Sequence, residues 1–356
     1  MARKGPSLPF WRYYCGPAMR GEFSPAFEEL RQQVEDELSC FLLSRRDANS
    51  EAALLVDEMI RLLSAGGKRL RPAFCYWGYR AGGGNHGVEI VRAAASLELL
   101  HTFALVHDDI MDGADERRGQ PTVHALHGLD VALLVGDLAL VLADDLFINC
   151  GFPPGRVMAG FDAYSRMRRE VIAGQFLDVM VTRREVVTEA EARRIAVLKS
   201  GRYTVQEPLL IGAALAGAAP ETQADLASFG DPLGEAFQLR DDLLGTFGER
   251  SSVGKPVDSD IREGKRNVLY AKALAALQGE DRRFFLSCWG GGDSLAAQDV
   301  ERLRKLVESS GARDSTEALL SELAGRAEGA LGRCRLTPEG RHALEALARL
   351  AINRDV

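Results

Sequence analysis

The chain has 356 residues, with 44 Lys and Arg against 51 Asp and Glu, so its formal net charge is -7. This acidic balance argues against a general nucleic-acid-binding protein, because such proteins carry a basic surface. Hydrophobic residues make up 46% of the chain and supply an ample core, and the length fits one large domain or two average ones.

The cysteine pattern and the apolar stretches bear on where the protein resides. Six cysteines are scattered without a CxxC pair, which predicts reduced thiols in a cytoplasmic protein and argues against a zinc site. The first 20 residues include basic side chains but no apolar run, so no secretory signal is expected. The longest apolar stretch, Val131 to Ala143, is interrupted by Asp137 and followed by two aspartates. It is too short and too charged for a transmembrane segment.

Taken in order, the chain reads as a series of helices after a short arm. Residues 1–24 contain Gly, Pro and aromatic residues without a period, which predicts an irregular arm. Ser24 and Pro25 then give a helix start, because Ser is a good N-cap and Pro is favoured at the first helical position. Apolar residues recur at three- and four-residue steps from there on. Helices are predicted over 25–38, 53–63, 88–111, 123–149, 155–180, 188–217, 221–246, 266–277, 295–309, 315–334 and 338–352.

Runs with the alternation typical of strands are absent, and Gly- and Pro-rich breakers fall between the helical segments. The sequence also lacks a long linker, a low-complexity tract and an internal repeat. These patterns predict an all-α fold, with a single domain of ten or more helices over 25–356.

Two stretches carry the acidic residues that suggest chemistry. In the first, Asp108 and Asp112 are four residues apart in a predicted helix and lie on one face, whereas Asp109 is turned roughly 100° away. In the second, Asp241 and Asp242 lie in another helical run. Carboxylate oxygens favour Mg²⁺, which is commonly completed by substrate phosphates. A metal-assisted diphosphate reaction is therefore predicted, and solvated helix caps are the alternative.

Basic residues at regular spacing precede and accompany the first acidic stretch. Lys68 and Arg71 are three residues apart at a predicted helix start, where outward-pointing backbone N–H groups also attract an anion such as diphosphate. His101 lies two turns before Asp108 on nearly the same face and could donate a hydrogen bond to a phosphate. A solvated basic turn and an ordinary core histidine are the alternatives for these two features.

More polar residues follow in loops and in later helices. Arg117 and Arg118 lie in a Gly- and Pro-flanked loop, where guanidinium groups could bind phosphates. Asp178 shares a predicted helix face with Gln175, and Lys199 offers a further cation. The basic segment 254–266 could form a lid, or it could be an ordinary charged surface loop.

Together these motifs resemble one family, the trans-isoprenyl diphosphate synthases or polyprenyl synthetases, and within it the geranylgeranyl diphosphate synthases most. The matching pieces occur in the family's order between residues 66 and 265. They are GGKRLRP at 66–72, ELLHTFALVHDDIMD at 98–112, RRGQPTVH at 117–124, GQFLD at 174–178, LKSG at 198–201, FQLRDDLLG at 237–245, GK at 254–255 and DIREGK at 260–265.

The resemblance implies a homodimer with an all-α, isoprenoid-synthase-type helical bundle and a central cavity. It also implies a head-to-tail transfer in which an allylic diphosphate, held by three Mg²⁺ ions, loses its diphosphate and is attacked by isopentenyl diphosphate. The implied metal ligands are Asp108, Asp112 and Asp241, supported by Asp178. The implied contacts of the allylic diphosphate are Arg117, Lys199, Ser200, Gln238, Lys255 and Lys265. The implied contacts of isopentenyl diphosphate are Lys68, Arg71, His101 and Arg118.

The chain departs from the family pattern at two positions. The family's second acidic motif is DDxxD, but position 245 is Gly, so the last carboxylate is missing. Activity is still expected, because the leading aspartate is the principal metal ligand in the family. Ser200 stands where Thr is usual, and its hydroxyl can make the same hydrogen bond.

Phe103 and Ala104 bear on the length of the product. Phe103 precedes Asp108 by five residues and lies about 7.5 Å lower along the helix axis, so it would form a floor beneath a growing prenyl chain. Family members with an aromatic residue here, a small neighbour and no insertion in the first motif resemble geranylgeranyl diphosphate synthases. A C20 product is therefore predicted, with C15 as the alternative.

Two other functions remain as alternatives. A class I terpene cyclase has a second motif of the form [ND]DxxSxxxE, which Asp241, Asp242 and Glu249 approach. Gly245, however, offers no oxygen at the Ser position, and a cyclase does not need the basic residues for a second substrate. A non-catalytic subunit that binds prenyl diphosphates is the other alternative, although the intact first motif and the basic loops argue against it.

Overall fold

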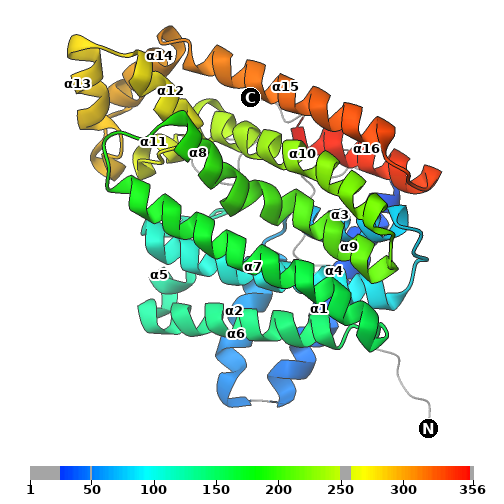
Figure 1. The fold of residues 1–356 in the computed structure, drawn as a ribbon. Coiled ribbons are helices and arrows are strands. Elements are labelled where there is room, and N and C mark those ends of the chain that lie inside the picture. The colour runs from blue at the N-terminus through cyan, green and yellow to red at the C-terminus, as the bar shows by residue number, and fades with distance from the viewer. Residues whose placement is uncertain (1–24, 49, 249–257, 353–356) are drawn as a thin grey trace. The chain divides into compact units, whose positions relative to one another are not determined.

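A computed structural model of the protein describes residues 25–48, 50–248 and 258–352, and helices make up most of this part (Figure 1). The all-α class is thereby confirmed. The predicted arm at 1–24 lies outside the described residues. Contacts divide the chain into two compact units, unit 1 with Met1–Tyr76 and His86–Pro153 and unit 2 with Trp77–Asn85 and Pro154–Val356. The single domain over 25–356 stays a prediction.

Unit 1 is built around one long helix whose middle is buried on every side. This helix, α4, is buried at every residue from Ala93 to Leu100, and it packs along α6 and against α1 and α2. It ends at Gly113, whose φ of 64° is the left-handed conformation typical of a glycine helix cap. The helices of unit 1 are α1 (Pro25–Ala48), η3 (Ser50–Ala52), α2 (Ala53–Ser64), the first part of α3 (Leu70–Ala81), α4 (Val88–Asp112), α5 (Val123–His127) and α6 (Leu129–Ile148).

Among the described helices, α4 is also the one long and apolar enough to cross a membrane by length and composition. About two thirds of its most apolar window, 67%, is buried inside the protein. Core helices pass the same composition test, so this helix is weak support for a membrane span.

A short hairpin follows α4 where the sequence predicts a loop. Strands β1 (Glu116–Arg117) and β2 (Gln120–Pro121) pair in antiparallel fashion. The two residues between them, Arg118 and Gly119, have φ of 55° and 71°. Tight two-residue hairpins need such positive φ values, so Arg118 is held in a conformation that is uncommon for a residue with a side chain.

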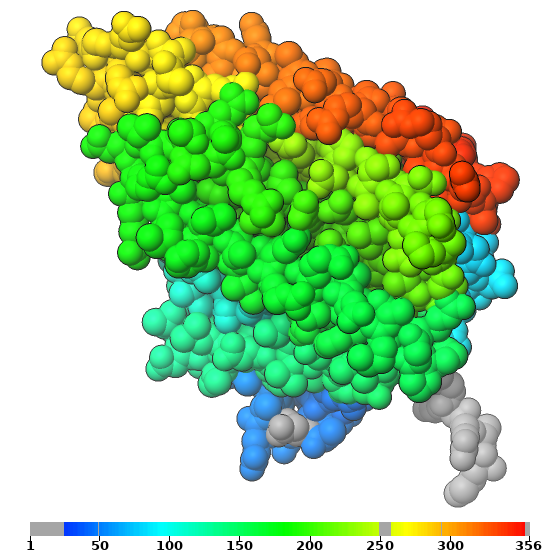
Figure 2. All heavy atoms as spheres, viewed as in Figure 1, coloured from blue at the N-terminus to red at the C-terminus, as the bar shows by residue number. Residues whose placement is uncertain are grey.

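Unit 2 contains the remaining helices, and α7 lies at its surface, as Figure 2 shows in green. The exposed side of α7 carries apolar residues, among them Met158, Ile172 and Phe176. The elements of unit 2, besides the end of α3, are α7 (Pro154–Thr182), α8 (Glu189–Ile195), η4 (Ala196–Gln206), α9 (Glu207–Ala216), α10 (Pro220–Phe247), α11 (Ser259–Glu263), α12 (Val268–Ala276), α13 (Gly279–Cys288), η5 (Gly292–Ser294), α14 (Ala297–Ser309), α15 (Ala312–Arg333) and α16 (Pro338–Ile352).

Two of the predicted helices are divided in the structure. The helix predicted over 123–149 breaks at Gly128, whose φ is 85°. The helix predicted over 188–217 contains η4, a π-helix of 11 residues between α8 and α9. A π-helix is wider than an α-helix and is rare, and it occurs mainly at functional positions.

Glycines let η4 approach its neighbours at backbone distance. A Cβ atom on Gly174 of α7 would lie 2.5 Å from the backbone nitrogen of Lys199. A Cβ atom on Gly234 of α10 would lie 2.6 Å from the carbonyl carbon of Gly201. Because real Cβ atoms do not approach backbone this closely, glycine at these positions fixes η4 between α7 and α10.

We expect Gly234→Ala to destabilise unit 2 by about 1–3 kcal/mol, because the added methyl group overfills this contact. The measurement is chemical denaturation followed by circular dichroism. Gly325→Ala is the matched control: Gly325 is exposed within α15 and a Cβ atom there would meet nothing within 4 Å. This control should be neutral or more stable by up to about 1 kcal/mol. Equal destabilisation by both changes would contradict the packing argument.

Candidate active site

The first acidic stretch ends α4 with carboxylates on two different faces. Asp108 and Asp112 lie one helical turn apart on one face and are both partly exposed. Asp109 is buried, with 3% exposure, and accepts a hydrogen bond of 2.6 Å from Nε of Arg117. The predicted metal ligands are therefore accessible, while the aspartate between them holds a predicted diphosphate-binding arginine. This role of Asp109 was not predicted from the sequence.

The hairpin that carries Arg117 and Arg118 is attached to the rest of unit 1 by its partners. Nη2 of Arg117 also lies 3.8 Å from Oδ2 of Asp108. Arg61 of α2 donates hydrogen bonds to the side chain of Gln120 and to the carbonyl of Pro121, at 3.2 and 3.1 Å. These contacts fix both arginines beside the end of α4.

Four arginines surround His101 and form what we call the basic cluster: Arg69, Arg71, Arg117 and Arg118 together with His101. Burial and then the charges of these arginines, Arg71 first, lower the pKa of His101 well below its usual range, so the imidazole is neutral. Loss of water around its guanidinium and the nearby charge of Arg69 lower the pKa of Arg118 to about 10. Cations at such mutual proximity form a ready binding site for an anion.

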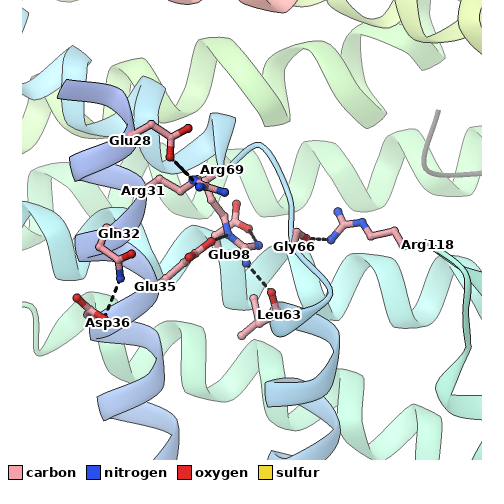
Figure 3. Close-up of polar contacts among 10 residues, drawn as sticks. All are labelled: Glu28, Arg31, Gln32, Glu35, Asp36, Leu63, Gly66, Arg69, Glu98 and Arg118. Atoms are coloured by element: carbon pink, nitrogen blue, oxygen red, sulfur yellow. Dashed lines mark hydrogen bonds and ion pairs between the residues drawn. The ribbon is translucent and has the colours of Figure 1, made fainter. Parts of the chain in front are cut away.

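Arg69 is held in place by polar partners within unit 1 (Figure 3). Its guanidinium donates to the buried carboxylate of Glu98 at 2.7 Å and to Glu35 at 3.3 Å. It also donates to the carbonyl of Leu63, at 2.6 Å. Burial raises the pKa of Glu35, and the charge of Arg69 opposes that shift. Because Arg69 lies between Lys68 and Leu70, this buried network fixes the turn that carries Lys68 and the start of α3 with Arg71.

No feature of the sequence indicated the role of Arg69. In GGKRLRP its spacing is as suitable for a ligand as that of its neighbours, yet its φ of 49° turns the backbone into the left-handed region. Its side chain is directed into unit 1, where only 6% of the residue is exposed. Arg118, by contrast, reaches over the same turn and donates a hydrogen bond to the carbonyl of Gly66 (Figure 3).

The residues predicted to set product length lie on the same helix as the aspartates. Phe103 and Ala104 are both partly exposed. The ring of Phe103 packs edge-on against His107, with ring centroids 4.9 Å apart. His107 in turn fills the space beside Gly136 of α6, where a Cβ atom would overlap its imidazole. Phe103 is thus supported by a second ring that is wedged against α6.

In unit 2 the structure brings together two residues that were predicted from separate motifs. Nζ of Lys199 lies 2.6 Å from Oδ2 of Asp178. The close approach of η4 to Gly174 explains this pair, because Asp178 lies one turn after Gly174 in α7. Ser200 and Gln175 are partly exposed beside it.

The second acidic stretch, in α10, has one accessible and one buried aspartate. Asp241 is partly exposed, whereas 4% of Asp242 is exposed. Nε2 of Gln238 donates to Oδ1 of Asp242 at 2.7 Å, so this predicted diphosphate contact is linked to the buried carboxylate. Burial, and then the charges of Asp260 and Asp241, raise the pKa of Asp242 well above its usual range.

The predicted loop residues are only partly described. Lys265 follows α11, and its Nζ lies 3.5 Å from Oε2 of Glu263. Lys255 lies outside the described residues, as does the rest of 254–257, whereas 258–266 of the basic segment are described.

The donor chemistry of the two acidic stretches fits a hard divalent cation. Within the described residues, no group of three or more His, Cys, Asp or Glu side chains could hold a metal ion by itself. Asp108 and Asp112 nevertheless offer carboxylate oxygens one turn apart, beside cations suited to phosphates. Mg²⁺ is commonly bound by one or two carboxylates together with substrate phosphates and water, and the residues present meet that requirement.

Comparison with known proteins agrees with this chemistry. The model of the polyprenyl synthetase family matches residues 53–307. A short chain isoprenyl diphosphate synthase of Methanothermobacter thermautotrophicus is 36% identical over 256 residues, which cover 72% of this chain and 77% of the relative. A (2E,6E)-farnesyl diphosphate synthase of Mycobacterium bovis is 36% identical over 252 residues, or 69% of this chain and 68% of the relative.

A solved structure is similar over nearly the whole chain. It is geranylgeranyl pyrophosphate synthase from Corynebacterium glutamicum, complexed with isoprenyl diphosphate and magnesium. The two are 33% identical with a TM-score of 0.88, and the match covers 92% of this chain and 99% of that one. With the fold, the paired carboxylates and the basic cluster in agreement, the chain belongs to the polyprenyl synthetase family, the trans-isoprenyl diphosphate synthases, and is a prenyltransferase.

Proposed function

We propose that the protein condenses isopentenyl diphosphate head-to-tail with an allylic diphosphate in a magnesium-dependent reaction. The observation that carries this proposal is the pairing of opposite chemistries at the end of α4. Asp108 and Asp112 suit hard cations, and the basic cluster beside them suits phosphate oxygens. A reaction between two diphosphate substrates requires both the carboxylates for the metal and the cations for the phosphates.

The proposed site of isopentenyl diphosphate consists of Lys68 together with Arg71, His101 and Arg118 of the basic cluster. A bound diphosphate would add negative charge beside His101 and thereby oppose the arginines that lower its pKa. The imidazole would then donate a hydrogen bond from each ring nitrogen when protonated. Arg69 is left out of this set, because its guanidinium is occupied by Glu98 and Glu35.

The remaining predicted residues are proposed for the allylic substrate and its metal. Asp108, Asp112 and Asp241 are the proposed ligands of Mg²⁺, and three ions per site are proposed. Asp178 orients Lys199 through their ion pair. When bound, Mg²⁺ would neutralise charge on the departing diphosphate. The proposed contacts of the allylic diphosphate are Arg117, Lys199, Ser200, Gln238, Lys255 and Lys265.

The proposed reaction consists of three bond changes. The carbon–oxygen bond of the allylic diphosphate breaks, and its electrons leave with the diphosphate. The double bond of isopentenyl diphosphate forms the new carbon–carbon bond to the allylic cation. Loss of a proton to the departed diphosphate restores a double bond in the product. The protein's part is to hold the two substrates in line and to stabilise the negative charge that develops on the diphosphate.

Incubation with Mg²⁺, isopentenyl diphosphate and dimethylallyl diphosphate, followed by chromatography of the products, tests this function. We expect longer prenyl diphosphates, and we expect Asp108→Asn to lower the rate by about 100-fold or more. Asp115→Asn is the control, since Asp115 is exposed just beyond α4, and it should leave the rate unchanged. Release of diphosphate without a longer prenyl diphosphate would indicate a cyclase. Binding without turnover would indicate a non-catalytic subunit.

We propose geranylgeranyl diphosphate, C20, as the main product. The support is the ring of Phe103, which is braced by His107 and lies below Asp108 on the same helix. A prenyl chain that grows along this helix would stop where it meets the two rings. Farnesyl diphosphate, C15, is the alternative, since relatives carry both product names.

Replacement of Phe103 by Ala should lengthen the main product by at least one isoprene unit, because the floor is removed while the aspartates stay in place. The measurement is the chain-length distribution of the products by mass spectrometry. Phe103→Tyr keeps the ring and should keep the product of the unchanged protein. If the Phe103→Ala variant and the unchanged protein gave the same chain-length distribution, Phe103 would not be the floor of the product site.

We propose that the protein is a homodimer and that α6 contributes to the interface. Its Leu134, Val141 and Ile148 recur every seven residues, which places them on one side of the helix. All three are more than half exposed, Val141 most at 61%. An apolar stripe of this kind on a water-exposed helix is typical of a surface covered by a partner, and a second copy is the partner that symmetric assemblies use most.

We expect light scattering after size exclusion to give about twice the monomer mass of 38.8 kDa. Val141→Glu should shift the protein to the monomer at micromolar concentration, because it places a charge in an apolar interface. Val88→Glu is the matched control: Val88 is exposed at the start of α4, and this change should leave the mass unchanged. A monomeric unchanged protein, or a dimeric Val141→Glu variant, would contradict the proposed role of α6.

A further inference from the structure

A carboxyl group from another helix fills the space that a side chain at position 245 would need. Gly245 is buried in α10, one turn after Asp241. A Cβ atom built on Gly245 would lie 2.6 Å from Cγ and Oδ2 of Asp260 and 2.7 Å from its Oδ1. Both residues belong to unit 2. No side chain larger than hydrogen fits at position 245 while Asp260 keeps its place.

Asp260 is held in this place by its own neighbours. It is the second residue of α11, and Asn267 donates a hydrogen bond from Nδ2 to its Oδ2 at 3.0 Å. The same Asn267 caps α12, since its Oδ1 accepts from the backbone nitrogen of Tyr270 at 3.0 Å. The backbone nitrogen of Lys265 donates to the carbonyl of Asp260 at 2.9 Å. The carboxyl group is therefore oriented by the starts of two helices.

Its position repeats the spacing of the first acidic stretch. Residues 241 and 245 are four apart in α10 and lie on one face, as Asp108 and Asp112 do in α4. The carboxyl group of Asp260 stands at the position of a residue-245 side chain. The second stretch thus has a carboxylate one turn after Asp241, supplied from α11 rather than from α10.

We infer that Asp260 replaces the carboxylate that position 245 lacks and supports Asp241 in binding magnesium. This inference rests on the proposed function, because it concerns the magnesium that the reaction uses. Asp260 is a positioning residue in this account: it adds negative charge and an oxygen acceptor beside Asp241 and acts on the substrate through the metal. Carboxylates that support a ligand in this way are commonly needed for tight metal binding.

Metal binding can be measured without turnover. The melting temperature is followed against Mg²⁺ concentration in the presence of inorganic diphosphate, which stabilises the folded protein when both bind. Asp260→Asn keeps the size of the side chain and an oxygen for the Asn267 contact but removes the charge. We expect it to raise the Mg²⁺ concentration for half-maximal stabilisation by about tenfold or more.

The matched control is Asp258→Asn, two residues earlier. The carboxylate of Asp258 pairs with Arg262 at 3.0 Å, and its φ of 75° is one that Asn also adopts. This control should keep the Mg²⁺ requirement of the unchanged protein. An Asp260→Asn protein with an unchanged requirement would overturn the inference.

Moving the carboxyl group from position 260 to position 245 gives a second, independent test. Asp260→Ala should raise the Mg²⁺ requirement as Asp260→Asn does, and Gly245→Asp alone should be destabilised, since its Cβ atom meets the Asp260 carboxyl group. Gly245→Asp combined with Asp260→Ala returns a carboxylate to the emptied space. This double variant should recover the Mg²⁺ requirement to within about threefold of the unchanged protein, a coupling of the kind expected between residues in contact. A double variant that behaves like Asp260→Ala would overturn the inference.

The failure of the proposed function would look different. If the unchanged protein neither responds to Mg²⁺ with diphosphate nor lengthens a prenyl diphosphate, the proposed function and this inference fail together. If the unchanged protein does both and the Asp260 variants respond as it does, the inference alone fails.

Discussion

The basic cluster depends on buried carboxylates that form ion pairs with its arginines. The four arginines of the basic cluster lie around the neutral His101, and their charges would repel one another if nothing offset them. Glu98 and Glu35 offset the charge of Arg69. Asp109 likewise offsets the charge of Arg117. Breaking a buried ion pair by removing one partner typically costs about 3–5 kcal/mol, so these pairs are central to unit 1.

This arrangement separates the arginines by task. Arg69 and Arg117 are each tied to a carboxylate, and they fix the positions of the turn at 66–69 and of the hairpin. Arg118 is directed over the turn toward Gly66 and has its pKa lowered to about 10, with loss of water as the first cause and the charge of Arg69 as the second. A bound diphosphate would add negative charge beside the Arg118 guanidinium and stabilise its charged form. The positive charge of the site is therefore in place before an anion binds, and it contributes to the binding energy.

In unit 2 polar side chains are also fixed beside one another, and there close backbone packing positions them. Glycines 174, 201 and 234 allow η4 to contact α7 and α10 without intervening side chains, and the π-helix places Lys199 beside Asp178. At Gly245 the absence of a side chain makes room for a carboxyl group from α11. Small residues at these points are thus part of the chemistry, because they determine which polar groups meet.

Local sequence determined a large part of this protein. Apolar periodicity indicated most of the helices, because a helix repeats every 3.6 residues regardless of what surrounds it, although α13 was not predicted. The spacing of Asp108 and Asp112 gave a shared face for the same reason, and the ordered motifs from 66 to 265 gave the family. These features depend on neighbours within a few residues or on matching strings, both of which can be read from the chain.

Tertiary structure decided which side chains meet across long separations in sequence. Arg69 resembles its ligand-type neighbours, and only its left-handed backbone and the buried Glu98, 29 residues away, make it structural. The position of the π-helix and the meeting of Gly245 with Asp260 likewise depend on how closely helices approach. Such contacts have no period in the sequence, because they are set by packing between distant segments rather than by the geometry of a single helix.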